Sequence, residues 1–426
     1  MQPLAEQQRL TRAAADDFGH LVHRVPETVL APATAAGVAA GIASAARDGR
    51  TFAPRGQGHS TFGRAQTDVA AAMAGLRGIG AVEDDRVTVE AGATWREVLA
   101  ATLPHGRTPP VLADYLDLSV GGTLAVGGTG PRTYALGAQT DHVLELEVVT
   151  GTGEVVRCSA DRLFDAVRAG LGQVAVITRA TLELVPAPSS VRWLRLFYPD
   201  LAALLAALRT VAADGRFDAL QGSIAQGAFR LDAARYFSGE PPDDAELVAG
   251  LGDYPARREP ATQGYLEHVD RLAPLEQTLR DNGVWFLPHP WLATFVGEGR
   301  VEQVVGAELE ALAPEDLGMF GQVLLSPLRR SAVATPLLRL PDDELCFAFT
   351  LIRFPETGDG ARLVDQNRAI AARVRAAGGT VYPVGALPLS AAEWREHFGE
   401  AFGPLAEAKA RFDPGRVLTP GYEVFG

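Results

Sequence analysis

A segment of high glycine content, residues 119–139, most restricts how this chain can fold. It reads SVGGTLAVGGTGPRTYALGAQ, which is too rich in glycine for a buried helix or strand of this length. Backbone without side chains can approach a ligand closely, as a nucleotide-binding wall requires. A run of tight turns would need the same residues. From composition alone, both interpretations stay open.

A second glycine-containing loop surrounds His59. The chain reads PRGQGHS from Pro54 to Ser60, directly after the strand-like TFAP. The proline and two glycines predict a loop, and backbone N–H groups of such a loop can form a concave site for a pyrophosphate. An ordinary loop histidine would give the same pattern. The other histidines show no ligand spacing that indicates a metal site, His20 and His23 included.

One motif is typical of a dinucleotide-binding fold, but the order of predicted helix and strand around it excludes that fold. Residues 170–175, GLGQVA, match the GxGxxA fingerprint of nicotinamide-dinucleotide domains. Here the motif follows a predicted helix and leads into a strand. That order is the reverse of the strand–loop–helix unit that directs a helix N-terminus at phosphate. We therefore expect no nicotinamide-binding Rossmann domain.

Helix and strand signals alternate through the first 188 residues. Thr34 predicts the cap of an amphipathic helix that ends at Gly49, and the Thr94 to Glu97 spacing predicts a capping box. Residues 142–159 read as a hairpin around TGTG. Pro186 and Pro188 end a long predicted strand and mark a domain boundary.

The pattern restarts after this boundary. We expect a strand, a helix and two strands around Gly222 and Gly227, then a polar, helix-rich stretch to about Leu312, and further strands and a long helix. The Ser390 to Glu393 spacing predicts a second capping box, opening a helix that runs toward Phe412. The prediction is an α+β protein with domain limits at 1–188, 189–388 and 389–426.

Composition excludes several classes of protein. The formal net charge of −13 argues against nucleic-acid binding. No apolar run reaches the roughly 20 residues of a membrane helix, and the first residues lack the pattern of a secretory signal. We therefore expect a cytoplasmic enzyme without a membrane or nucleic-acid partner. Cys158 and Cys346 lie in apolar, strand-like runs and are expected to be core residues.

Asp114 is a candidate base. It lies in PPVLADYLDLSVGG, between apolar neighbours such as Leu112 and Leu116. A carboxylate in a partly apolar site can accept a proton during catalysis. A solvated turn residue or a helix cap is the alternative.

Several motifs together resemble one family of flavoenzymes. The PRGQGHS loop resembles the covalent-attachment loop of FAD-dependent oxidoreductases of the vanillyl-alcohol-oxidase superfamily, and the whole chain is similar to cytokinin dehydrogenases. The matching segments are 54–66, 113–124, 142–159, 168–188 and 289–296, with EWREHFG and KARFDPGRVLTPGYEVF near the end. The resemblance implies a two-part PCMH-type FAD-binding domain and a substrate domain whose antiparallel sheet is flanked by helices.

The resemblance also implies residue roles. His59 matches the histidine bonded to the 8α-methyl group of FAD, and Asp114 matches the aspartate that accepts a proton from the substrate. The electron acceptor would be oxygen or a quinone, and the protein a monomer or homodimer. The remaining residues that the resemblance places at the cofactor are Gly56, Gln57, Gly58, Ser60, Arg64, Ser119, Gly121, Gly122, Thr123, Gly127, Gly128, Ile177, Thr419 and Tyr422.

The chain departs from the family pattern mainly where substrate is handled. Arg64 and Tyr422 replace family glutamines, and Gln221 stands where plant enzymes carry a substrate-holding glutamate. Ala113 replaces an aromatic residue, and residues 382–390 offer no counterpart to a family tyrosine. We expect oxidation of a small amine such as an N6-alkylated adenine. An alcohol, sugar or natural-product oxidase is the alternative, and a flavin-retaining binding protein a third.

Overall fold

A parallel three-stranded sheet forms the first layer of the N-terminal part. The computed structural model describes residues 2–252, 254, 256–355 and 359–426. Helix α2 (Ala35–Arg47) packs against this sheet, and the Thr34 hydroxyl caps it by accepting from the Gly37 N–H, as predicted. The strands, in spatial order, are β1 (Thr28–Leu30), β3 (Val69–Ala72) and β2 (Phe52–Arg55).

A five-stranded antiparallel sheet forms the second layer. The predicted hairpin is present as two of its strands, and the GLGQVA motif indeed lies between a helix, α6 (Arg162–Val167), and a strand. Helices α3 (Trp95–Thr102), α4 (Val120–Leu124) and α5 (Thr133–Leu136) lie between its strands in the sequence. The strands, in spatial order, are β4 (Ile79–Val82), β5 (Arg86–Glu90), β9 (Ala175–Glu183), β7 (Val143–Thr150) and β8 (Val155–Cys158).

An eight-stranded antiparallel sheet forms the centre of the second half. Helices α7 (Leu201–Asp214), α11 (Glu298–Ala311) and α13 (Gly360–Ala376) pack against it. Its strands, in spatial order, are β14 (Ala256–Gly264), β11 (Ser190–Tyr198), β13 (Ala228–Phe237), β12 (Ala219–Ala225), β16 (Gln322–Arg329), β17 (Leu345–Ile352), β15 (Leu292–Gly297) and β18 (Thr380–Val381). The expected α+β class, with an antiparallel sheet flanked by helices, is confirmed.

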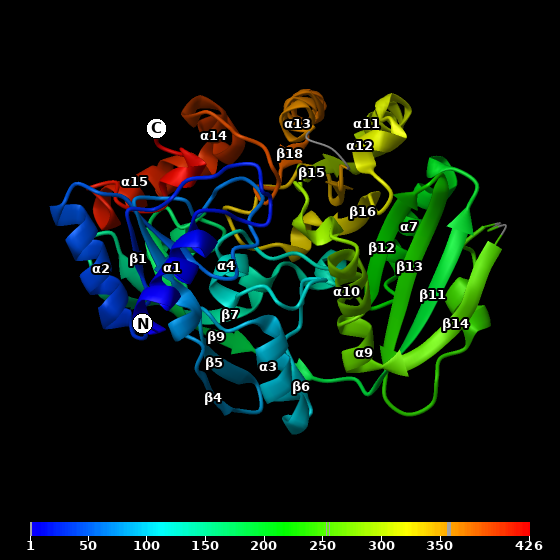
Figure 1. Ribbon diagram of the computed structural model, residues 1–426. Helices are drawn as coiled ribbons and strands as arrows, with labels where there is room; N and C mark the ends of the chain where they lie inside the picture. Colours follow the sequence, from blue (N-terminus) through cyan, green and yellow to red (C-terminus); the bar gives the residue numbers. More distant parts are fainter. Residues whose placement is uncertain (1, 253, 255, 356–358) are drawn as a thin grey trace.

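Two short helices lie between the halves. Helices α9 (Tyr265–Val269) and α10 (Ala273–Asp281) lie between the eight-stranded sheet and the N-terminal part (Figure 1). Their position brings the chain around residues 265–286 to the side of the N-terminal loops. Residues of these helices can therefore complete a site that the N-terminal loops begin.

The end of the chain returns to the N-terminal sheet. Helices α14 (Ala391–Phe398) and α15 (Phe402–Phe412) lie beside the N-terminal part, where α15 contacts α6 (Figure 1). The Phe52 N–H donates to the Val417 carbonyl at 2.7 Å, and the Thr419 N–H donates to the Phe52 carbonyl at 2.8 Å. The last residues therefore extend the first sheet.

Three details differ from the sequence prediction. The helix expected from Ser390 to Phe412 is two helices, because the chain turns at Gly399, where φ is +52°. The helix-rich stretch to Leu312 also contains β14 and β15. Strand β14 is exposed and charged at the sheet edge, so it lacks the apolar alternation that predicts a strand. Helix α1 (Gln2–Ala14) was not predicted.

Among the described residues, no helix combines the length and apolar character needed to cross a lipid bilayer. Both cysteines are in the core, as expected. Burial raises the pKa of the Cys158 and Cys346 thiols to about 12. Neither thiol is therefore poised for reaction at neutral pH.

Candidate active site

The two glycine-containing loops meet. A Cβ atom on Gly56 would lie 2.0 Å from the Ser119 Oγ atom, so a side chain at position 56 would displace that of Ser119. A Cβ on Gly122 would meet only the Ser119 Oγ within 4 Å, so the rest of the space beside Gly122 is open. Segments 54–60 and 119–130 contain no acidic residue. Bare backbone and hydroxyl groups without carboxylates suit a dinucleotide diphosphate, so the residues present fit FAD.

His59 lies between two aromatic rings. Its imidazole stacks on Phe18 at 4.0 Å between centroids and on Tyr115 at 4.7 Å. Burial, together with the nearby His289 and Arg280, lowers the pKa of His59 to about 3. The imidazole is therefore neutral at physiological pH. Since both ring faces are covered, a partner can reach His59 only at the ring edge, which carries the nitrogens.

Rings from the second half complete this cluster. Phe18 also stacks on His289 at 3.9 Å, and Trp285, which follows α10, packs at a tilt against Phe18, His59 and Tyr115. His59 thus lies where the two halves of the chain meet. A group bonded to His59 would be positioned by residues of both halves.

Asp114 is held by two side chains of the second half. Its Oδ2 accepts a hydrogen bond from the Gln221 amide at 3.0 Å, and its Oδ1 forms an ion pair with Arg271. Gln221 lies on β12, and Arg271 follows α9. The structure therefore brings together Asp114 and Gln221, both of which the sequence analysis proposed. Asp114 directly precedes Tyr115, whose ring stacks on His59, so one loop carries the candidate base and a residue that contacts the candidate tether.

A small cavity lies beside Asp114. Its volume of about 20 Å³ accommodates a water molecule but no organic substrate. Arg132 and Arg271 contribute charge to its wall, and Tyr236 and Tyr265 contribute aromatic surface. The other lining residues are Pro110, Leu112, Ala113, Pro131 and Val269.

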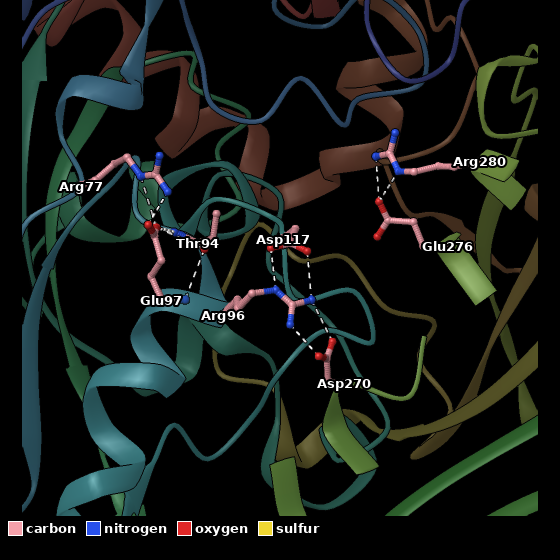
Figure 2. A network of polar contacts seen from close by, with 8 residues as sticks. All are labelled: Arg77, Thr94, Arg96, Glu97, Asp117, Asp270, Glu276 and Arg280. Carbon is pink, nitrogen blue, oxygen red and sulfur yellow. Dashed lines mark hydrogen bonds and ion pairs between the residues drawn. The ribbon is translucent and has the colours of Figure 1, made fainter. Parts of the chain in front are cut away.

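An arginine on α3 ties the Asp114 loop to the turn between α9 and α10. Arg96 donates to Asp117 at 2.8 and 2.9 Å and to Asp270 at 2.5 and 2.8 Å (Figure 2). These two carboxylates raise the pKa of Arg96. Asp270 and Arg271 are consecutive, so one turn of the second half pairs with Arg96 and with Asp114. The Asp114 loop is therefore fixed from two sides.

Other residues proposed for the cofactor are spread over the N-terminal part. Thr123 accepts a hydrogen bond from the Trp95 indole at 2.9 Å, and Ile177 is buried in β9. Gly121 packs against Ala91, while Gln57 is exposed. Gly127 and Gly128 have φ angles of +108° and +72°, which favour glycine. Gly58, with φ of +69°, and Ser60 flank His59 directly.

Arg64 and Tyr422 join the His59 loop to the end of the chain. Arg64 donates to the Leu387 carbonyl at 2.6 Å, and its guanidinium lies 4.7 Å from the Tyr422 ring centre. Thr419 donates through its hydroxyl to the Gly172 carbonyl at 3.0 Å. These three residues connect the His59 loop and the Gly172 turn to the C-terminal segment.

Sequence reasoning missed Arg271, Phe18 and Trp285. Arg271 contacts Asp114 across 157 residues of sequence, within HVDRLAP, where no local pattern distinguishes it. Among the described residues, no group of three or more His, Cys, Asp or Glu side chains could hold a metal ion.

Comparisons with known proteins agree with this geometry. A model of the FAD binding domain family matches residues 26–159. A second model, described as the FAD and cytokinin binding region of cytokinin dehydrogenase 1, matches residues 256–425. The fold and these matches define the class: an FAD-dependent oxidoreductase.

Curated relatives cover nearly the whole chain. An uncharacterized oxidoreductase, ORF5 in the fasciation locus of Rhodococcoides fascians, is 38% identical over 97% of both chains. Cytokinin dehydrogenase 10 of Oryza sativa subsp. japonica is 32% identical over 97% of this chain and 87% of its own length. Cytokinin dehydrogenase 7 of the same rice is 33% identical over 97% of this chain and 90% of its own. This chain belongs to the cytokinin dehydrogenase family of FAD-dependent oxidoreductases, and the predicted family is confirmed.

Proposed function

We propose that this protein oxidises a small amine, such as an N6-alkylated adenine, with Asp114 as the base that accepts the substrate N–H proton. The observation that carries the proposal is the Asp114 carboxylate, held by Gln221 and Arg271 beside the ring cluster of His59. The names of the rice relatives support an adenine-type substrate. FAD, when bound, supplies a hydride acceptor at its N5 atom.

The residues of the site divide the work. Hydride loss from a C–H bond becomes easier when the adjacent N–H gives up its proton, and Asp114 is placed to take it. The Gln221 amide fixes one carboxylate oxygen, so the other must serve the substrate or remain paired with Arg271. Because the cavity beside Asp114 is small, substrate binding must separate Asp114 from Arg271.

We further propose that His59 forms a covalent bond to the 8α-methyl carbon of FAD. The new C–N bond would replace the imidazole N–H bond and one methyl C–H bond. Two protons would be released, and the two electrons would pass through the flavin to the oxygen or quinone acceptor. A neutral imidazole has a free nitrogen lone pair, which bond formation to a carbon atom requires. The flanking Gly58 and the covered ring faces limit how the imidazole can move. Such a tether would prevent the cofactor from dissociating.

The proposal also covers the electron acceptor, the location, the oligomeric state and the domain limits. The electron acceptor is oxygen or a quinone. The protein works in the cytoplasm as a monomer or homodimer. Residues 1–188 and 389–426 form the FAD-binding domain, and residues 189–388 form the substrate domain, which agrees with the distribution of the sheets.

Anaerobic flavin reduction tests the substrate. Purified protein is mixed with isopentenyladenine, and the flavin absorbance is followed. Bleaching supports the amine proposal, and no bleaching contradicts it.

The second candidate is oxidation of an alcohol, sugar or natural-product intermediate on the same fold. Gln221 favours it, because an amide replaces the glutamate expected for adenine binding. Bleaching with alcohols but not with the adenine would establish this alternative. Protein that no amine or alcohol reduces would instead be a flavin-retaining binding protein.

A further inference from the structure

The chain ahead of β1 contacts the His59 loop directly. We name residues 17–19 the N-terminal strap. The Phe18 N–H donates to the Gly58 carbonyl at 2.9 Å, and the Gly19 N–H donates to the Ser60 carbonyl at 3.1 Å. The strap thus holds the backbone on both sides of His59. The matched FAD binding domain begins only at residue 26, so the strap lies outside it.

Asp17 ties the strap to the loop by its side chain. The carboxylate is buried, with 6% of the residue exposed, and its Oδ2 accepts from the Ser60 hydroxyl at 2.8 Å and from the Gly63 N–H at 2.6 Å. Its Oδ1 accepts from the Gly19 N–H at 3.0 Å. Burying a carboxylate costs free energy unless hydrogen bonds satisfy it. The buried Asp17 carboxylate therefore favours the loop conformation that supplies these donors.

The strap lies very close to the His59 loop at Gly19. A Cβ on Gly19 would lie 2.0 Å from the Thr61 carbonyl oxygen. Only glycine therefore allows the strap to lie against the loop at this point. The Phe18 ring then covers one face of the His59 imidazole.

The other side of the strap is fixed by the second half. The His289 N–H donates to the Gly19 carbonyl at 2.8 Å, and the His289 Nδ1 lies 2.6 Å from the Phe18 carbonyl. Because a carbonyl only accepts, Nδ1 must carry the proton. The strap is therefore held between the His59 loop and a buried residue of the substrate-side half.

We propose that the N-terminal strap is the positioning element for FAD attachment: Asp17 fixes the loop backbone and Phe18 fixes the His59 ring. The inference rests on the proposed covalent bond between His59 and FAD. Neither residue needs to touch the reacting atoms. Each acts through His59, which only a fixed loop can direct toward one point.

The test compares full-length Asp17→Asn with Asp16→Asn. An asparagine at position 17 has one acceptor oxygen. Either the Ser60 hydroxyl and the Gly63 N–H lose their acceptor, or an amide NH₂ group faces the Gly19 N–H, which is itself a donor. Asp16 is the adjacent acid, lies partly exposed and pairs with His20, so it is a matched control. The measurement is the fraction of flavin that precipitates with the protein in acid. We expect a fall of about tenfold in Asp17→Asn and no change in Asp16→Asn.

A second variant covers the case in which Asp17→Asn does not fold. Phe18→Leu keeps apolar volume and all the strap hydrogen bonds but removes the ring from the His59 face. It should also lower the covalent fraction while leaving the circular dichroism spectrum unchanged. Covalent fractions equal to wild type in every variant that folds would overturn the inference.

Failure of the covalent proposal gives a different result. Wild-type protein without covalent flavin would contradict the tether. In that case the strap still predicts an FAD dissociation constant about tenfold higher in Asp17→Asn than in Asp16→Asn. Equal dissociation constants would then overturn the strap.

Discussion

The environment of Asp114 combines one carboxylate with an amide and a guanidinium. A glutamate at position 221 would place a second negative charge at hydrogen-bond distance from Asp114, where Gln221 donates at 3.0 Å. When two carboxylates lie at hydrogen-bond distance, ionising both of them costs free energy. Gln221 avoids that conflict, and Gln221 and Arg271 together hold both carboxylate oxygens of Asp114.

Replacing Asp114 by asparagine tests the base. An amide of the same shape keeps the packing but cannot take a proton. We expect unchanged FAD content and flavin reduction slower by roughly 10² or more. Stopped-flow absorbance measures the rate. Asp117→Asn serves as the comparison, because it weakens the contact of the same loop with Arg96 on α3 but leaves the Asp114 carboxylate in place. Equal rates in Asp114→Asn and wild type would exclude Asp114 as the base.

Replacing His59 by alanine tests the tether. The variant should bind FAD only reversibly, since the imidazole nitrogen is lost, and acid precipitation should release the flavin into the supernatant. His289→Ala is a useful comparison, because it removes a stacked neighbour of Phe18 but no proposed bonding atom. Flavin that still pellets with His59→Ala shows that another residue holds it.

The elements around the site depend on local signals of differing strength. Both capping boxes form as predicted, because a serine or threonine and a glutamate three residues later bond within one helical turn. Around the Ser390 box, hydrogen bonds from Ser390 and Arg375 hold the pKa of Glu393 at about 2. The glutamate therefore remains ionised near neutral pH and continues to cap α14.

Removing the Ser390 hydroxyl should weaken α14. Ser390→Ala loses the bond to the Glu393 N–H, and we expect a loss of about 1 kcal/mol in the free energy of unfolding. Urea denaturation measures it. Thr210→Ala on α7 is the control, because that hydroxyl bonds to a carbonyl inside a helix, where alanine is favoured. A similar loss in both variants would mean that capping does not explain the effect.

Features that depend on residues close together in the sequence could be predicted from it. The family resemblance supplied part of the remaining site. His59 and Asp114 could be proposed from their motifs. Arg271 and Asp17 could not, since their contacts span 157 and 46 residues. Strand β14 was missed for a related reason: it is defined by its pairing with β11 and not by its own apolar pattern.

At the scale of the whole molecule, several histidines are buried in neutral form. Burial lowers the pKa of His268 and His397 to about 3 and that of His289 to about 4. In the unfolded chain each would take a proton near pH 6.5. The unfolded state therefore binds more protons below this pH, and stability falls as the pH falls.

Thermal melting between pH 5 and pH 8 tests this expectation. The melting temperature should stay level from about pH 8 to pH 7 and then decrease, with each histidine contributing up to about 1.4 kcal/mol per pH unit below its unfolded pKa. His397→Gln should make the fall of the melting temperature smaller by the contribution of one histidine. His105→Gln is the control, since His105 is exposed. A melting temperature that does not change down to pH 5 would contradict the buried neutral state.

The return of the C-terminal residues to Phe52 has a consequence for the order of events during synthesis. Residues 417–419 leave the ribosome after the entire eight-stranded sheet, yet the edge of the first sheet bonds to them. The N-terminal layers can form early, but the edge of the first sheet can close only after residues 417–419 have been synthesised. The cofactor site then closes after the eight-stranded sheet has been synthesised, and FAD capture follows synthesis of residues 417–419.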